Sequence, residues 1–493
     1  MYYVSTRDAS LRYTASQAIV QGLSREGGLF LPEQIPMLPE GSIERLAKLP
    51  YTERAVYVMK LYLDEFTEDE LRTFAERAYG PEKFDTPAAA PLAYPEENTA
   101  VLELWHGPTC AFKDMALQML PYLLTASLRK TGEEKTACIL VATSGDTGKA
   151  ALEGFRDVEH TKILVFYPKN GVSDIQKLQM VTQEGSNVGV CAVVGNFDDA
   201  QTGVKKIFSD PVMREKLAAD GKLLSSANSI NWGRVLPQIV YYVSAYCDLL
   251  AAGRLRMGEK VNVCVPTGNF GNILAAYYAK RMGVPFDRLI CASNSNNVLT
   301  DFIRTGVYDR NRPFYTTMSP SMDILISSNL ERLLYLLSGS DEVVRGYMQQ
   351  LAETGRYKVS EALRAQIAEH FSCGFCDERT TAQTIHDVYE KDGYLIDTHT
   401  AVAWAVLDAY RRETGDEKCT VLASTASPFK FCADVLSALG VTEHETGTKI
   451  LSQLSGCTGR PEPKPLASLA GKPVRFTGAT EKERMADAVL ELL

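Results

Sequence analysis

Short apolar runs alternate with stretches of helical length after residue 95, and no other feature of the sequence constrains the fold as strongly. The runs share a length of four to seven residues and occupy residues 100–104, 137–141, 163–167, 188–194, 261–265 and 420–423. Strands separated by helical segments are typical of βαβ units, in which helices cover a parallel sheet. The sequence therefore predicts an α/β protein with parallel sheets flanked by helices.

The chain has 493 residues, which is more than one hydrophobic core usually supports. We expect an N-terminal domain that ends in a Pro-rich span typical of a linker, a small α/β domain, and a large domain built from two segments. The expected ranges are residues 1–95, 137–225, and 96–136 with 226–493. Within the large domain, residues from about 300 to 390 are helix-rich and charged without an obvious strand series, which suggests an insertion or a capping region.

Composition narrows the classes of partner. The net charge is -9, whereas proteins that bind nucleic acids or anionic membranes usually carry an excess of Lys and Arg. We therefore expect a small-molecule partner. The first residues lack a secretory pattern, and no apolar stretch is long enough to cross a bilayer, so we expect a cytoplasmic protein. The composition leaves a monomer and a dimer equally open.

The eleven cysteines lie mostly in apolar segments, where a reduced thiol behaves as a small hydrophobic side chain. Cys373 and Cys376 have the spacing of half a zinc or redox site, but no second pair accompanies them. We therefore expect no metal.

The lysine segment, residues 106–114, places Lys113 at the start of an apolar helical run. This position is typical of a lysine that carries a cofactor. His106 in this segment, and His399 beside Asp397, lack metal-ligand spacing, so we expect them to be packing or hydrogen-bonded supporting residues.

The Gly268 loop lies between an apolar strand and a helical pattern, and comprises Gly268, Asn269, Phe270, Gly271 and Asn272. Glycines allow the backbone to approach an oxyanion, and the free N–H groups of a helix start favour negative charge. The loop suits a phosphate, although a tight turn that binds nothing has the same pattern. It is not the dinucleotide fingerprint, because the glycine spacing differs.

The Thr143 loop, residues 143–148, contains Thr143, Ser144, Gly145, Asp146 and Thr147 and precedes a helical pattern. It differs at two positions from a nucleotide-binding P-loop. Its hydroxyls and its helix start suit a carboxylate or a phosphate, and an ordinary helix cap is the alternative.

The Asn228 segment, residues 228–234, offers Ser229, Asn231 and Arg234 before another helical pattern. Arg234 could hold a phosphate through paired donors, whereas a single Arg near a helix start is more often an ion-pair residue.

In combination these stretches resemble the threonine synthase family over nearly the whole chain. The matching segments are residues 3–7, the lysine segment, 144–148, 167–169 with 171–173, 228–234, the Gly268 loop, 397–401 and 425–431. The resemblance implies a fold-type-II, tryptophan synthase β-like pyridoxal-phosphate enzyme. It further implies conversion of O-phospho-L-homoserine and water to L-threonine and phosphate, the last step of threonine biosynthesis.

The resemblance also implies roles for individual residues. Lys113 would form the Schiff base and act as the catalytic base, the Gly268 loop would hold the cofactor phosphate, and Thr425 would lie near the pyridine nitrogen. Substrate would bind at Thr143 and Ser144–Thr147, which would receive its carboxylate, and its phosphate at Thr147, Ser229, Asn231 and Arg234.

Three other functions stay open. A serine/threonine dehydratase or phospho-lyase of the same fold would give a 2-oxo acid and would need no second phosphate site. The Thr143 loop could serve a phosphoryl-transfer enzyme, and a relative without catalytic activity could keep the same fold.

Overall fold

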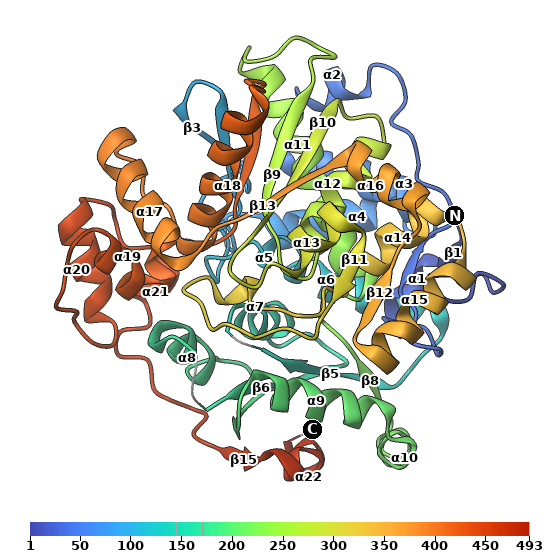
Figure 1. Ribbon diagram of the computed structural model, residues 1–493. Coiled ribbons are helices and arrows are strands. Elements are labelled where there is room, and N and C mark those ends of the chain that lie inside the picture. Colours follow the sequence, from blue (N-terminus) through green and yellow to red (C-terminus); the bar gives the residue numbers. More distant parts are fainter. Residues whose placement is uncertain (144, 170–171, 493) are drawn as a thin grey trace.

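The computed structural model describes residues 1–143, 145–169 and 172–492, and two mostly parallel sheets dominate it (Figure 1). The large sheet has the order β13 (Phe371–Phe375), β10 (Phe286–Ser293), β9 (Val261–Pro266), β14 (Thr420–Ser424), β4 (Thr99–Glu103) and β3 (Leu92–Glu96). The small sheet has the order β15 (Ala479–Glu481), β7 (Val188–Val194), β6 (Thr161–Pro168), β5 (Thr136–Ala142) and β8 (Lys222–Ser225). Within these two sheets, all pairings are parallel except β3 with β4. The α/β prediction is confirmed, and all six apolar runs are strands.

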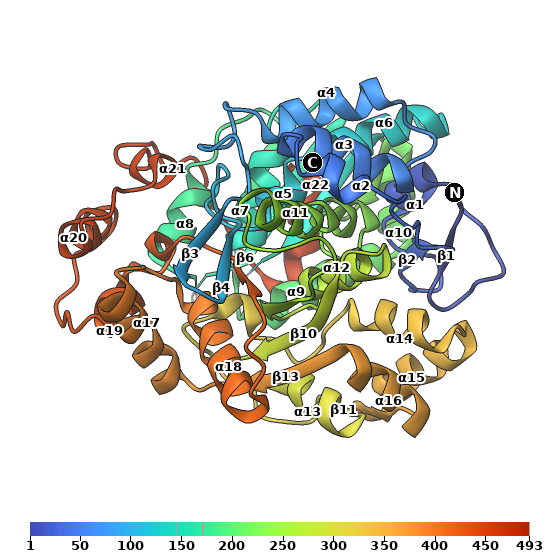
Figure 2. The same cartoon turned by 90° about the horizontal axis from the view of Figure 1, so that it is seen from above.

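Helices follow the strands as the alternation predicts. Those between the strands of the two sheets are α5 (Asp114–Leu117), α6 (Leu120–Thr131), α7 (Asp146–Phe155), α8 (Asp174–Val181), α9 (Phe197–Ser209), α10 (Pro211–Ala219), α11 (Trp232–Ala251) and α12 (Gly271–Arg281). A second group, α17 (Glu378–Asp392), α18 (Thr398–Thr414), α19 (Cys432–Ala438), α20 (Lys449–Thr458) and α21 (Lys464–Ala467), lies on the side away from the N-terminal helices (Figures 1 and 2). Within the described ranges, no helix is both long and apolar enough to span a membrane.

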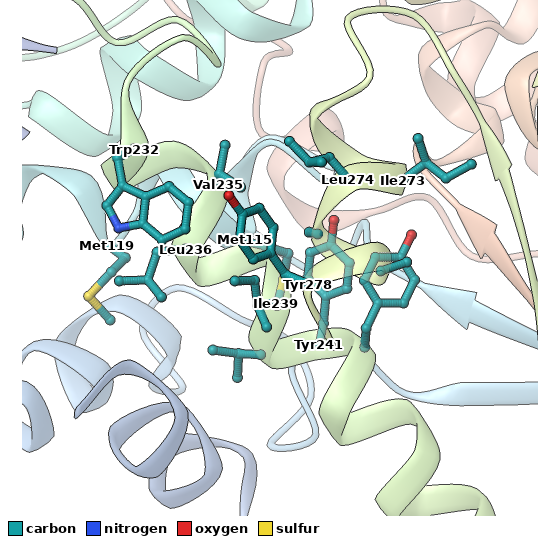
Figure 3. Packing of buried hydrophobic residues seen from close by; sticks show 14 of the residues in the cluster. Met115, Met119, Trp232, Val235, Leu236, Ile239, Tyr241, Ile273, Leu274 and Tyr278 are labelled. Carbon is teal, nitrogen blue, oxygen red and sulfur yellow. The ribbon is translucent and has the colours of Figure 1, made fainter. Parts of the chain in front are cut away.

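The N-terminal elements share a core with the large sheet. They are β1 (Tyr3–Ser5), α1 (Ala15–Gln21), β2 (Phe30–Pro32), α2 (Ser42–Leu46), α3 (Tyr51–Tyr62) and α4 (Glu68–Tyr79). Their buried side chains belong to the same hydrophobic cluster as α6, α11 and α12. Figure 3 shows part of this cluster, where Trp232 and Leu236 pack near Met119.

The Pro-rich span, residues 87–95, is not the linker that the sequence predicted. Its second half forms β3, which pairs antiparallel with β4 at the edge of the large sheet. The pairing register shifts between Ala93 and Glu96, where Pro95 lies. An edge strand with an irregular register tolerates a residue that has no N–H to donate, so proline did not exclude a strand here.

Residues 300 to 390 contain three strands that the sequence did not reveal. They form α13 (Val298–Thr305), β11 (Val307–Asp309), η1 (Pro320–Met322), α14 (Leu330–Ser338), α15 (Asp341–Thr354), β12 (Arg356–Lys358), α16 (Glu361–His370) and then β13. The edge strand β13 is only partly buried, which explains why it lacks a long apolar run.

The C-terminal segment joins the small sheet. After α21 the chain runs to β15, which pairs with β7, and ends in η3 (Lys482–Arg484) and α22 (Met485–Leu492) (Figure 1). Met485 and Val489 belong to the hydrophobic cluster under α9. The division into three domains stays a prediction, and a small domain built on this sheet would include a segment far outside residues 137–225.

We expect Trp232→Ala to lower the free energy of unfolding by about 3–5 kcal/mol, because it opens a cavity between the N-terminal segment and α11. The Trp232 side chain is fully buried against the rings of Tyr3, Tyr62 and Tyr278, at centroid distances of 5.7, 5.7 and 5.3 Å. Urea denaturation measures the change. Tyr2→Ala, at a ring that is 53% exposed, is the control and should change it by less than about 0.5 kcal/mol; equal effects of the two variants would contradict this packing.

Candidate active site

The stretches singled out in the sequence follow the carboxyl ends of five strands. The lysine segment follows β4, the Thr143 loop follows β5, the Asn228 segment follows β8, the Gly268 loop follows β9, and Thr425 follows β14. In open parallel sheets this is where ligands bind, because the loops there lead into helix N-termini.

The backbone places Lys113 beside Thr425. Phe112 donates its N–H to the carbonyl of Thr425 at 2.8 Å, and Ala111 pairs with Ala426 in an antiparallel bridge. Lys113 then begins α5. The predicted neighbours therefore come together through the pairing of two loops.

The Lys113 amine lies in a largely buried polar pocket. Its Nζ donates to Ser321 Oγ at 3.0 Å and lies 3.7 Å from Asp146 Oδ2, and the side chain is 11% exposed. Burial lowers the pKa of Lys113 to about 8; Asp146 opposes the shift, while the positive charges of Lys430 and Arg234 add to it. A lysine with this pKa supplies an appreciable fraction of free amine near neutral pH, as a nucleophile or a general base needs.

Asp146 is held between two lysines. Its Oδ1 bonds Lys430 Nζ at 2.7 Å and accepts from Gln176 Nε2 at 2.8 Å. Lys430 is 1% exposed and also donates to the carbonyl of Thr109 at 2.8 Å. Burial favours the neutral acid, but Lys430 and Lys113 outweigh it and hold the pKa of Asp146 well below its ordinary value. Asp146 is therefore a permanent anion beside the reactive amine.

Thr143 is bonded to the start of α7. Thr143 Oγ1 accepts the N–H groups of Gly145 and Gly148, each at 2.9 Å, so its oxygen is committed to the loop itself. Gly145 has φ of 142°, and a Cβ there would lie 2.5 Å from the Gln176 side chain, so only glycine is tolerated. Thr147 is half-buried, and Ser144 lies outside the described residues.

The Gly268 loop fits a phosphate group. A Cβ on Gly268 would lie 2.6 Å from the carbonyl oxygen of Ser321, so the backbone approaches another chain segment closely. The Asn272 Oδ1 accepts from Tyr241 at 2.8 Å and also from Tyr242, while its Nδ2 is buried without a partner. The first turn of α12 leaves further N–H groups free for an anion. Asn269 and Phe270 supply the backbone between the two glycines of the loop, and Phe270, with φ of 63°, is the N-cap residue of α12.

Asn329 joins this loop to the Asn228 segment. Its Nδ2 donates to Ser229 Oγ at 3.1 Å and to the carbonyl of Asn269 at 3.0 Å. Arg332 supports the same junction, because it donates to the carbonyls of Ser229 and Ile230 at 3.3 and 2.6 Å.

Asn231 is occupied by the protein itself. Its Oδ1 caps α11 by accepting from Gly233 N–H at 2.9 Å, and its Nδ2 donates to the carbonyls of Ile19 and Ser226. The structure thus gives Asn231 a positioning role, and direct phosphate binding by it stays a prediction.

Arg234 is a buried guanidinium without a carboxylate. The residue is 3% exposed. Its NH1 group donates to the carbonyl of Ala227, and its Nε has no partner among the described residues. Burial lowers the pKa of Arg234 to about 10. No Asp or Glu among the described residues forms an ion pair with it, so an anionic ligand would complete its bonding.

Four residues of the site were not predicted from the sequence: Lys430, Ser321, Asn329 and Asn294. Asn294 anchors the loop that carries Ser321. A lysine flanked by Phe429 and Phe431 was a usable signal for Lys430.

Asp397 and His399 are the supporting pair that the sequence indicated, since His399 Nδ1 bonds Asp397 at 2.7 Å. His106 bonds both Asp85 and Glu103, whose carboxylates outweigh the effect of burial and raise its pKa to about 9.

Cys373 and Cys376, whose spacing is that of half a zinc or redox site, belong to no candidate metal-binding cluster in the described part of the chain. Among the described residues, no cluster of three or more His, Cys, Asp or Glu side chains could hold a metal ion. Cys376 is buried and its Sγ lies 3.2 Å from Thr381 Oγ1.

Known proteins match this chain throughout its length. Residues 2–79 match the family model described as threonine synthase N terminus, and residues 97–425 match that of pyridoxal-phosphate dependent enzymes. Human threonine synthase-like 1 is 41% identical over 90% of this chain, which spans only 61% of that relative. Yeast threonine synthase is 35% identical over 100% of this chain and 98% of its own. A solved structure of pyridoxal-phosphate-bound threonine synthase from Brucella melitensis is 37% identical, with a TM-score of 0.87 over 100% of this chain and 99% of its own.

The fold and the match to the family of pyridoxal-phosphate dependent enzymes define the class as fold-type-II pyridoxal-phosphate-dependent enzymes. Both family models and the full-length relatives narrow this class further. The chain belongs to the threonine synthase family.

We expect Gly268→Ala to weaken binding of pyridoxal phosphate by about tenfold or more, because the added methyl group displaces Ser321 or the loop. Spectroscopic titration of the apoprotein measures the affinity. Gly456→Ala, where nothing lies within 4 Å of the added Cβ, is the matched control. Wild-type affinity in Gly268→Ala would show that the loop does not contact the cofactor.

The pH dependence of covalent cofactor capture should report the Lys113 amine. The rate should rise with pH through about 8, because only the free amine attacks the aldehyde. Lys430→Met removes a positive charge that lowers the pKa of Lys113. The pKa of Lys113 should therefore rise in this variant, and the increase in capture rate should occur at higher pH. Lys418→Met, at a 43% exposed lysine, should leave the pH profile unchanged. Stopped-flow absorbance gives the profile, and an unshifted profile in Lys430→Met would contradict the coupling.

Proposed function

We propose that this chain is a threonine synthase, a lyase that converts O-phospho-L-homoserine and water to L-threonine and phosphate in the last step of threonine biosynthesis. The observation that carries the proposal is a pair of separate anion-binding groups around Lys113. One is the Gly268 loop with the unpartnered Asn272 Nδ2, and the other is Arg234 with its unpartnered Nε. A cofactor phosphate and a substrate phosphate need two such places.

The cofactor residues follow from this arrangement. Lys113 would hold pyridoxal phosphate covalently, residues 268–272 would hold its phosphate, and Thr425 would supply a neutral hydroxyl near its ring nitrogen. Bound there, pyridoxal phosphate withdraws electrons from the substrate Cα and so makes its proton acidic. Thr425 is 5% exposed and its segment is paired with the lysine segment, which supports this assignment.

The protein side chains then handle the substrate and the protons. Once the substrate amine replaces it, the freed Lys113 amine removes the Cα proton and later returns one, as its lowered pKa permits. The Asp146 backbone N–H group and the Thr147 hydroxyl would receive the substrate carboxylate at the N-terminus of α7, next to Gly145 and together with Ser144, which lies outside the described residues. Thr147, Ser229 and Arg234 bind its phosphate, and Asn231 fixes the start of α11 from which Arg234 projects.

We also propose a cytoplasmic enzyme that works as a monomer or a dimer on a free small-molecule substrate. All eleven cysteines are free, which supports a reducing compartment.

Lys113→Ala should abolish threonine formation, because the other lysine amine beside Asp146, that of Lys430, is already bonded to Asp146 and to the carbonyl of Thr109 and so cannot replace the Lys113 amine. The assay supplies O-phosphohomoserine and measures phosphate, threonine and 2-oxo acid together. Lys260→Ala, at a 66% exposed lysine, is the control and should retain full activity. Wild-type release of phosphate with a 2-oxo acid in place of threonine would instead establish the phospho-lyase alternative.

A further inference from the structure

The loop between β11 and α14 reaches the active site and is fixed by a buried carboxylate. Asp323 accepts from Thr317 N–H at 2.9 Å and from its hydroxyl at 2.7 Å. It also accepts from Asn294 Nδ2 at 2.8 Å and Asn296 Nδ2 at 3.0 Å, and both amides directly follow β10. These bonds tie the loop to the end of a central strand of the large sheet, so the loop is held in one conformation.

Ser321, in the short helix η1 of this loop, contacts three parts of the site. Its Oγ accepts from Lys113 Nζ at 3.0 Å, and its N–H donates to His399 Nε2 at 3.1 Å. Its carbonyl oxygen lies 2.6 Å from where a Cβ on Gly268 would be. Ser321 therefore lies between the reactive amine and the loop that fits the cofactor phosphate.

His399 can act as a fixed clamp on Ser321. Because Nε2 accepts the backbone N–H, the ring proton must reside on Nδ1, which faces Asp397 at 2.7 Å. Asp397 is fully buried and caps α18 through the N–H groups of His399 and Thr400, at 3.0 and 3.1 Å. The Asp397 carboxylate, which its bonds to the start of α18 hold in place, therefore sets the orientation of the His399 imidazole.

We propose that Ser321 is a further catalytic residue that aims the Lys113 amine, and that His399 and Asp397 are positioning residues that hold Ser321. Ordering a long lysine side chain costs conformational entropy, so an oxygen that anchors Nζ favours the reactive orientation. When Nζ takes the Cα proton, its lone pair becomes an N–H bond, and Ser321 Oγ and Asp146 accept from the ammonium that results. Ser321 gives up no proton. The inference rests on the proposed function, because it assigns Lys113 as the base.

Ser321→Ala tests the hydroxyl and leaves the backbone N–H for His399 in place. We expect covalent capture of pyridoxal phosphate by the apoprotein to slow by about tenfold, and Ser321→Thr, which restores a hydroxyl, to recover most of the rate. Thr316→Ala removes an exposed hydroxyl from the same loop and should match the wild type. Capture is followed by visible absorbance, so the readout does not depend on turnover. Wild-type capture rates in Ser321→Ala would overturn the proposal.

Two substitutions at His399 separate positioning from general stability. His399→Gln supplies an amide oxygen that can accept the Ser321 N–H, whereas His399→Leu supplies no acceptor. We expect His399→Leu to capture the cofactor as slowly as Ser321→Ala does, and His399→Gln to recover at least part of the wild-type rate. Each variant is assayed at the same number of degrees below its own unfolding midpoint. Equal capture rates in the two variants would overturn the positioning role.

Failure of this inference is distinguishable from failure of the proposed function. If the wild type captures pyridoxal phosphate at Lys113 and forms threonine while Ser321→Ala captures equally fast, only the role of Ser321 is wrong. If the wild type attaches no cofactor at Lys113, the proposed function itself is wrong.

Discussion

The buried ion pair between Asp146 and Lys430 is the interaction on which the rest of the site depends. Asp146 begins α7 after a strand of the small sheet, whereas Lys430 follows β14 of the large sheet, so their contact at 2.7 Å joins the two sheets. Taking both charges out of water is costly, and only good geometry with additional hydrogen bonds offsets it. Gln176 and the carbonyl of Thr109 supply those bonds, at 2.8 Å each. The pair also sets the electrostatics of Lys113, since one member attracts its proton and the other repels it.

The sequence predicted the fold wherever a strand is buried on both faces. β5, β6, β9 and β14 are almost fully buried, and such strands appear as uninterrupted apolar runs. The sequence did not predict β10, because Asp287 and Arg288 interrupt its apolar run. Its register with β9 shifts at the same point. The edge strands β3, β13 and β15 are partly exposed, so neither length nor hydrophobicity marks them.

The candidate site was predictable to the extent that it is local. Lys113, the Gly268 loop and the Thr143 loop each carry their chemistry within a few consecutive residues, at a strand end and a helix start. Ser321 and Asn329 carry no such signal, because they act through contacts with segments 208 and 60 residues away. Asn231 shows what sequence alone does not reveal: its Oδ1 caps α11 and its Nδ2 donates to the carbonyls of Ile19 and Ser226, so the protein itself already uses both ends of the amide that the sequence offered for a phosphate.

Unpartnered polar atoms at this site differ from those elsewhere in the protein. Ser127 and Tyr62 also have buried hydroxyls without partners, but each is a single neutral group in a hydrophobic core. Arg234 is a charged group with no carboxylate partner among the described residues, so burying it costs more than burying a neutral hydroxyl, and its bond to the Ala227 carbonyl offsets only part of that cost. Asn272 adds a second incomplete donor on a different loop. If these two donors bind the two phosphates as proposed, ligand binding would complete their hydrogen bonds and stabilise the folded protein. The unliganded protein would then be less stable, but its donors would already be in place when the anions bind.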